Sequence, residues 1–156
     1  MTVSVYRSSG AINASVVISY AESLKIIFPS SYIEIISTYN WLRLNNDTFD
    51  FTDLSGQKND RDINFYGYEQ ESYMGSGTII DAQDFDVYGY DKVVAIGFSA
   101  NGDYICFDYR QNPTIDNPPV VLMYHDQYVN GEHGQSKMAI VKIADDFDSF
   151  IHMLHE

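Results

Sequence analysis

The sequence is poor in cysteine, in positive charge and in long apolar runs, and each shortage excludes a class of protein. Its single cysteine, Cys106, excludes an intrachain disulfide framework and is typical of a reducing compartment. No run of about 18 apolar residues could span a bilayer, and the first residues lack the basic stretch and apolar run of an export signal. We therefore expect a cytoplasmic protein without a membrane-spanning segment.

Basic residues are the second shortage, because 9 Lys and Arg stand against 22 Asp and Glu and give a formal net charge of −13. Binding to nucleic acid or to anionic lipid depends on Lys and Arg neutralising phosphate charge, so neither is expected as a direct partner. An acidic surface can instead attract a basic protein and speed its association. Solubility alone is the alternative explanation of the charge.

The chain has enough apolar residues to form one compact core. The chain has 156 residues, of which 45 % are hydrophobic and 15 % aromatic. This length suits one domain and is short for two, and no internal repeat is visible. Residues 1–156 are therefore expected to form a single domain.

Two helices are predicted near the N-terminus. Apolar residues recur at helical spacing over residues 14–27. Pro29 ends this helix and suits the first turn of a second one, in which Tyr32, Ile36 and Tyr39 share one stripe. The two helices therefore meet next to Pro29.

The rest of the chain mixes strand patterns with short helices. Alternating or continuous apolar runs predict strands at residues 41–44, 49–51, 63–68, 120–124 and 138–143. The polar residues 55–62 predict an exposed loop, and residues 78–86 fit either a helix capped by Thr78 or a strand. A final helix is predicted by one apolar stripe, with Asp145 or Asp146 as its cap: Phe147, Phe150, Ile151 and Leu154.

A β-hairpin is the strongest local signal. Asn101-Gly102 lies between the β-rich runs 93–99 and 103–109, and this dipeptide favours a tight two-residue turn. Such a turn predicts the cross-strand pairs Phe98–Ile105, Ile96–Phe107, Gly97–Cys106 and Ala95–Asp108. One face of the hairpin is then apolar, and the other is suited to close approach by a second layer.

Five short motifs occur in a fixed order along the chain. They are Phe28-Pro29-Ser30-Ser31-Tyr32, Tyr39-Asn40-Trp41, Gly102-Asp103 continuing to Asp108, Pro119-Val120-Val121 continuing to His125, and Ala144-Asp145-Asp146-Phe147-Asp148-Ser149-Phe150. In this order they resemble the SUKH superfamily, the Smi/Knr-like domain of many bacterial immunity proteins and of a fungal cell-wall regulator. Trp41 stands where the family has glycine, and Asp146 where it has serine.

The resemblance implies a fold and a function. The fold is α+β, a single SUKH-like domain with a mostly antiparallel sheet of about six strands flanked by helices, and its core spans about residues 15–154. Eight residues carry its structural motifs: Pro29, Tyr32, Asn101, Gly102, Asp108, His125, Phe147 and Phe150. The implied function is that of a bacterial immunity protein, or antitoxin, that neutralises a cognate toxin without being an enzyme.

Acidic residues interleaved with aromatic ones form the candidate partner surface, since such a mixture suits a protein interface. The acids are Asp60, Asp62, Glu69, Glu71, Asp81, Asp84 and Asp86, and the aromatics are Tyr66, Tyr68, Tyr73 and Phe85. The toxins of such immunity proteins are often nucleases, which must present a basic face to nucleic acid. We therefore expect a basic toxin, possessing such a face, as the partner; the sequence leaves the oligomeric state open.

Catalytic and metal sites are considered and not expected. Cys106 and His125 lack an accompanying oxyanion-hole signature, and Cys106 lies inside a predicted strand. One helix face carries Asp148, His152 and His155, but a single helix of ligands is a poor metal site. No cofactor is implied, and Asp108 with Arg110 forms a structural ion pair more readily than a catalytic one.

Two alternative functions remain beside the immunity protein. A non-catalytic scaffold like the fungal regulator would bind signalling partners. A carboxylate-dependent hydrolase or metal enzyme would use Asp84 and Asp86, because paired carboxylates serve glycosidases and divalent cations. A solvated acidic surface is the commoner outcome for such a pair.

Overall fold

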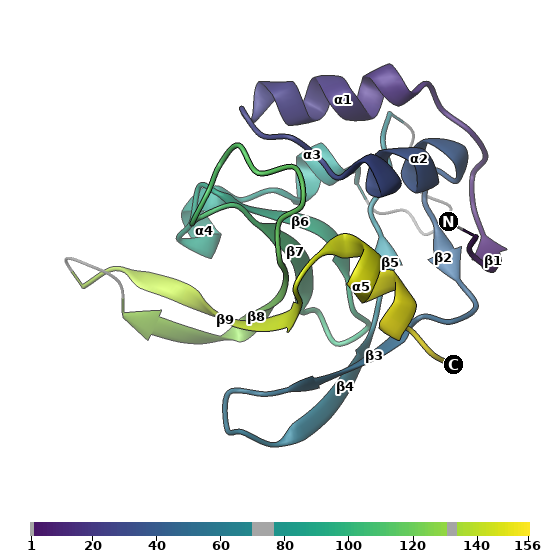
Figure 1. Ribbon diagram of the computed structural model, residues 1–156. Coiled ribbons are helices and arrows are strands. Elements are labelled where there is room, and N and C mark those ends of the chain that lie inside the picture. Colours follow the sequence, from purple (N-terminus) through teal and green to yellow (C-terminus); the bar gives the residue numbers. More distant parts are fainter. Residues whose placement is uncertain (1, 70–76, 131–133) are drawn as a thin grey trace.

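The computed structural model describes residues 2–69, 77–130 and 134–156 and has an α+β fold (Figure 1). Its main sheet is antiparallel, with the strand order β5-β6-β7-β8-β9. These strands are β5 (Asn64–Phe65), β6 (Val93–Phe98), β7 (Tyr104–Asp108), β8 (Val120–Asn130) and β9 (Ser136–Ala144). Two further strand pairs are β1 (Val5–Arg7) with β2 (Arg43–Leu44), and β3 (Thr48–Thr52) with β4 (Lys58–Asp62). The predicted fold class is confirmed.

Helices cover both faces of the main sheet. They are α1 (Ala14–Ser23), α2 (Ser30–Thr38), α3 (Ile79–Ala82), α4 (Phe85–Tyr88) and α5 (Phe147–Met153). On one face, Phe107 of β7 meets Tyr32 of α2 and Phe147 of α5 at ring-centroid distances of 5.1 and 5.8 Å. On the other face, Tyr104 of β7 meets Tyr88 of α4 at 5.2 Å. Residues of opposite parity on one strand thus build two separate layers of the core.

The first helix is shorter than predicted. Asn13 caps it by accepting a hydrogen bond of 2.9 Å from the Ser15 backbone N–H. It ends at Ser23 and not at residue 27, because Lys25 adopts a φ of +59°, which is left-handed backbone. The two helices therefore do not meet next to Pro29, contrary to the prediction. Pro29 is the N-cap of the second helix, which begins at Ser30, and the fixed φ of proline is compatible with that position.

Trp41 explains a departure from the family pattern. Its φ is +58°, a conformation that glycine adopts without strain and that a bulky residue does not. The indole is 1 % exposed and lies flat against Gly67, where an added Cβ would come within 2.4 Å of the ring. Burial of the large ring therefore holds a backbone conformation that would otherwise be unfavourable.

The prediction of a loop over residues 55–62 is wrong, because residues 58–62 form β4 and pair with β3. Only the turn between the two strands is irregular, and Asp53 organises it by accepting hydrogen bonds from the backbone N–H groups of Ser55 and Gln57. The residues of β4 are all polar, so no apolar alternation identifies the strand. Backbone pairing with β3 is what forms it.

The central hairpin forms as predicted, but with a different register. The turn has three residues, because the Ser99 N–H donates to the Asp103 carbonyl at 2.9 Å and Gly102 alone has a positive φ, of +97°. The observed pairs are Phe98–Tyr104, Gly97–Ile105, Ala95–Cys106, Val94–Phe107 and Val93–Asp108, with a bulge between Ala95 and Gly97. A type I turn closed by a glycine bulge is the common three-residue alternative to the two-residue turn.

The C-terminal half otherwise follows the predictions. Strand β8 is interior in the sheet, and its first half is buried while its second half projects as an exposed ribbon with β9 (Figure 1). Asp146 caps α5 by accepting a hydrogen bond of 2.7 Å from the Ser149 N–H. Phe147 and Phe150 are fully buried. Among the described residues, no helix has the length and apolarity needed to cross a membrane.

Candidate partner-binding surface

The predicted acidic residues fall into two separate groups. Asp60 and Asp62 lie on β4, which projects away from the helices α3 and α4 (Figure 1). Asp81, Asp84 and Asp86 lie on or next to α3 and α4. Glu69 follows β5 with a φ of +63° and is exposed, whereas Glu71 and Tyr73 lie outside the described residues. We call Asp81, Asp84 and Asp86 the acidic face.

Two members of the acidic face also hold the local backbone. The Asp81 carboxylate accepts a hydrogen bond of 3.1 Å from the Thr78 N–H in a capping box, and residues 79–82 form the helix α3 and not a strand. Asp84 caps α4 by accepting from the Val87 N–H at 3.2 Å. Asp86 is exposed in the first turn of α4. The carboxylates of Asp81 and Asp84 are thus held in place by hydrogen bonds, and Asp86 adds a third, exposed carboxylate beside them.

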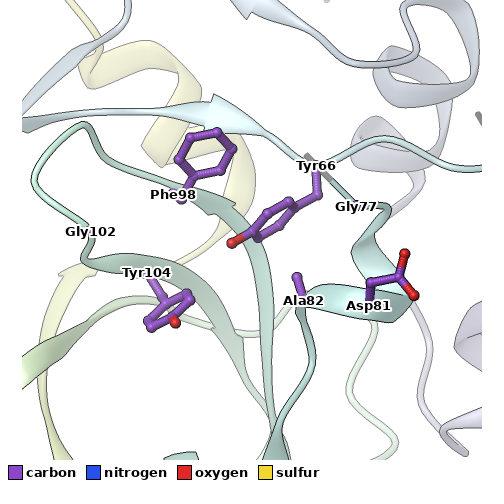
Figure 2. A pocket seen from close by; sticks show the side chains of 7 residues that line it. All are labelled: Tyr66, Gly77, Asp81, Ala82, Phe98, Gly102 and Tyr104. Atoms are coloured by element: carbon purple, nitrogen blue, oxygen red, sulfur yellow. The ribbon is translucent and has the colours of Figure 1, made fainter. Parts of the chain in front are cut away.

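A pocket of about 310 Å³ opens beside α3, between that helix and the ends of the central hairpin (Figure 2). Its walls are the rings of Tyr66, Phe98 and Tyr104, which come from three neighbouring strands or strand ends. Its remaining lining is Gly77, Asp81, Ala82 and Gly102. We call this the aromatic pocket.

The rings of the aromatic pocket face a shared space, and the Asp81 carboxylate turns away from it toward the Thr78 backbone (Figure 2). Tyr66 and Phe98 contact each other at a centroid distance of 5.1 Å. Burial is the largest cause that raises the pKa of Tyr104, and Cys106, Asp84 and Tyr128 raise it further. Asp84 of the acidic face is therefore close enough to act on the pocket.

The aromatics predicted for the surface divide between surface and core. Tyr66 is 8 % exposed and packs in the core while one side of its ring lines the pocket, and Phe85 is partly buried on α4. Tyr68 is 1 % exposed and its hydroxyl bonds to that of Tyr32 at 2.9 Å, so it belongs to the core. Phe98 and Tyr104 were missed, because their positions at the mouth of the hairpin predicted only a cross-strand role.

A second cluster, centred on Asp103, was not predicted. The carboxylate is 1 % exposed in the folded chain. Its Oδ1 accepts from the His125 N–H at 3.1 Å and lies 2.6 Å from His125 Nδ1, while its Oδ2 accepts from Arg61 Nε at 3.1 Å and Asn101 Nδ2 at 3.0 Å. Burial acts to raise the pKa of Asp103, but these hydrogen bonds outweigh it and the pKa lies below its ordinary value. The cluster ties β4, the hairpin turn and β8 together.

The histidine face considered for a metal does not converge. Asp148 accepts a hydrogen bond of 2.5 Å from the Ser31 hydroxyl, and His155 lies beyond α5, bridged to Thr48 and 3.1 Å from Asp50. Within the described ranges, the group of three ligand-type side chains that come together is instead Asp103, His125 and Asp126. Both oxygens of Asp103 already accept hydrogen bonds from protein donors, which gives this carboxylate a structural role.

Cys106 and Asp108 have the surroundings of structural residues. Cys106 is fully buried in β7, and burial raises the pKa of its thiol far above the ordinary value, whereas a nucleophilic cysteine needs a lowered pKa. Asp108 and Arg110 form the predicted ion pair, with two N–O distances of 2.9 Å. This fork-like pair lies at the end of β7.

Comparison with known proteins gives one family. Residues 13–153 match the SMI1 / KNR4 family (SUKH-1). No curated protein and no solved structure matched the chain. The matched range covers the helices, the main sheet, the acidic face, the aromatic pocket and the Asp103 cluster.

Proposed function

The chain belongs to the SMI1 / KNR4 family (SUKH-1), and from that premise we propose that it is an immunity protein that binds and neutralises a cognate toxin. The observation that carries this proposal is the family match over residues 13–153, which includes nearly the whole chain. The immunity role is the one that the SUKH resemblance implies for bacterial members of the superfamily. The proposed protein acts by contact and transforms no substrate.

The charge of the chain supports a basic toxin, and a nuclease in particular. A nuclease needs a basic face to hold phosphates, and an acidic protein that covers this face excludes the substrate by both charge and bulk. The net charge of −13 suits such a cover. The acidic face and the aromatic pocket are the proposed contact region, because acids orient a basic partner and tyrosines supply contact area.

The surroundings of the reactive side chains support a non-enzymatic role. Cys106 is buried with a raised thiol pKa. Asp103 accepts hydrogen bonds from three protein N–H groups and contacts the His125 ring, and Asp84, which a hydrolase would use, caps a helix. Structural roles for these side chains support the proposal that the chain acts by binding.

The test is co-purification with the protein encoded next to this chain's gene. We expect a stable complex on size-exclusion chromatography and loss of that protein's nuclease activity when the chain is added in equal amount. A neighbour-encoded protein that neither binds nor loses activity would contradict the proposal and leave the scaffold alternative.

A matched pair of variants locates the contact region. Asp84→Asn with Asp86→Lys lowers the negative charge of the acidic face while Asn still serves as a helix cap. Glu22→Lys with Glu34→Gln, at exposed positions of α1 and α2, changes the overall charge by the same three units and is the control. Neutralisation should weaken for the first variant and stay close to the original level for the second.

A further inference from the structure

We propose that the aromatic pocket holds the side chain of an arginine from the basic partner. This assignment rests on the proposed function and deepens it, because it names the chemical group that the contact region takes. The pocket is lined by Tyr66, Phe98 and Tyr104 on one side and by α3 on the other (Figure 2).

The walls suit a flat cation. Three electron-rich rings face one space, and Tyr66 and Phe98 lie 5.1 Å apart with their planes tilted by 38°. A guanidinium is attracted to the face of such rings and stacks on them better than an ammonium does. The cavity of about 310 Å³ is at the lower end of the range of about 300–1,000 Å³ that small-molecule sites occupy, so it fits one side chain.

The hydroxyl groups of Tyr66 and Tyr104 are available to accept hydrogen bonds from a ligand in the pocket. Within residues 2–69, 77–130 and 134–156, no side chain or backbone group forms a hydrogen bond with the hydroxyl of Tyr66 or of Tyr104. Tyr66 is 8 % exposed and Tyr104 is partly buried, so the rings are packed into the fold while their hydroxyls remain within reach of a partner from solvent. A guanidinium carries five N–H donors and could serve both hydroxyls from one position.

Charge selects a cation over an anion or a nucleotide. No Lys or Arg is among the described residues that line the pocket, and Asp84 acts on Tyr104 from α4. The net charge of −13 attracts a basic side chain and repels a phosphate. An aromatic base carrying a phosphate would fit the rings and meet this repulsion.

Two of the pocket walls are held by contacts with the rest of the fold. Tyr104 is backed by Tyr88 at a centroid distance of 5.2 Å, and the Tyr88 hydroxyl donates to the Ala82 carbonyl. The Tyr66 N–H donates to the Ile96 carbonyl at 3.0 Å, which fixes its position against the sheet. Walls that are already ordered lose little entropy on binding, which is how aromatic anchors gain affinity.

The experiment is a titration of the ¹⁵N-labelled full chain with arginine blocked at both termini, followed by two-dimensional NMR. Blocked citrulline, which has the same shape without the charge, and blocked lysine are the comparison ligands. We expect saturable shifts for blocked arginine, in the millimolar range, confined to the amides around Tyr66, Phe98 and Tyr104. Lysine should bind more weakly and citrulline should cause no saturable shift.

Two variants keep the fold and separate the two features of the pocket. Phe98→Leu retains an apolar residue in β6 but removes an aromatic wall, and Tyr104→Phe retains the ring but removes a hydroxyl. We expect Phe98→Leu to weaken arginine binding at least about threefold and Tyr104→Phe to weaken it less. Tyr6→Ala, at an exposed tyrosine of β1, is the control and should bind as the original chain does.

Equal shifts with citrulline, shifts spread over the acidic residues generally, or no saturable shift would each overturn the assignment. These outcomes are separate from the fate of the proposed function. A chain that neutralises its toxin but fails to bind arginine would keep the immunity role and lose the pocket. A chain that binds arginine but does not bind the toxin would keep the arginine pocket and lose the immunity role.

Discussion

Asp103 and His125 are joined across the hairpin and β8, with 2.6 Å between the carboxylate Oδ1 and the imidazole Nδ1. The same carboxylate receives Arg61 from β4 on its other oxygen, at 3.1 Å. Three segments distant in sequence therefore meet at one buried carboxylate. A buried charge is stable only while its partners are in place, so the fold depends on the contacts of this carboxylate.

Removing the carboxylate should destabilise the protein. Asp103→Ala leaves Arg61 without its buried partner and the His125 N–H without an acceptor, so we expect a loss of about 3 kcal/mol in the free energy of unfolding. Urea denaturation followed by circular dichroism measures it. Asp126→Ala, at the exposed neighbour, is the control and should change stability by less than about 0.5 kcal/mol. Equal effects for both variants would contradict the assigned role.

The same carboxylate predicts a pH dependence. The folded-state pKa of Asp103 is below its ordinary value, because the hydrogen bonds that it accepts outweigh the opposing effect of burial. Its contribution to stability is therefore fully present above the unfolded value of about 3.9 and is lost as the pH falls through the lower folded pKa. The free energy of unfolding of Asp103→Asn should fall less steeply than that of the original chain below about pH 4. Parallel curves for the two proteins would contradict this account.

Trp41 allows the strain of its backbone to be measured. Trp41→Ala and Trp41→Gly both remove the buried indole, and each should destabilise the protein by about 2–5 kcal/mol. Glycine alone adopts the φ of +58° without cost, so Trp41→Gly should be more stable than Trp41→Ala by about 1 kcal/mol. Thermal and urea unfolding of the pair provide the difference, and a less stable glycine variant would show that the turn is not strained.

Cys106 should be unreactive in the folded protein. Its side chain is fully buried in β7 and its thiol pKa is raised, so the thiolate that attacks disulfide reagents is scarce and shielded. We expect a chromogenic disulfide reagent to label one thiol in denaturant and almost none in native buffer over the same time. Rapid labelling of the native chain would contradict the burial of this residue.

Local signals allowed much of the fold to be predicted. The apolar stripe of Phe147 and Phe150, preceded by the capping residue Asp146, is enough to predict α5. Pro29 likewise predicts the start of α2. The strand β4 could not be predicted, since its side chains are polar on both faces and only the backbone of β3 selects it. The register of the hairpin was predicted wrongly, because Asn101-Gly102 is compatible with both a two-residue and a three-residue turn.

The candidate site was harder to predict than the fold. Acids on α3 and α4 were evident as a dense run, but their use as helix caps depends on where those helices begin. The aromatic pocket combines Tyr66 with Phe98 and Tyr104, and its existence depends on how β5 and the hairpin end beside α3. The network of Asp103 joins residues 22 and 42 positions apart, which no local pattern encodes.

The central claim, that this chain works by covering a basic protein with its acidic face, is tested most directly by association rates measured at several salt concentrations. The measurement is stopped-flow mixing of the chain with the protein encoded by the adjacent gene. We expect the rate to fall at least about tenfold between low salt and about 0.5 M salt, and the Asp84→Asn, Asp86→Lys variant to be slower only at low salt. A rate independent of salt, and equal for the original chain and the variant, would contradict the claim.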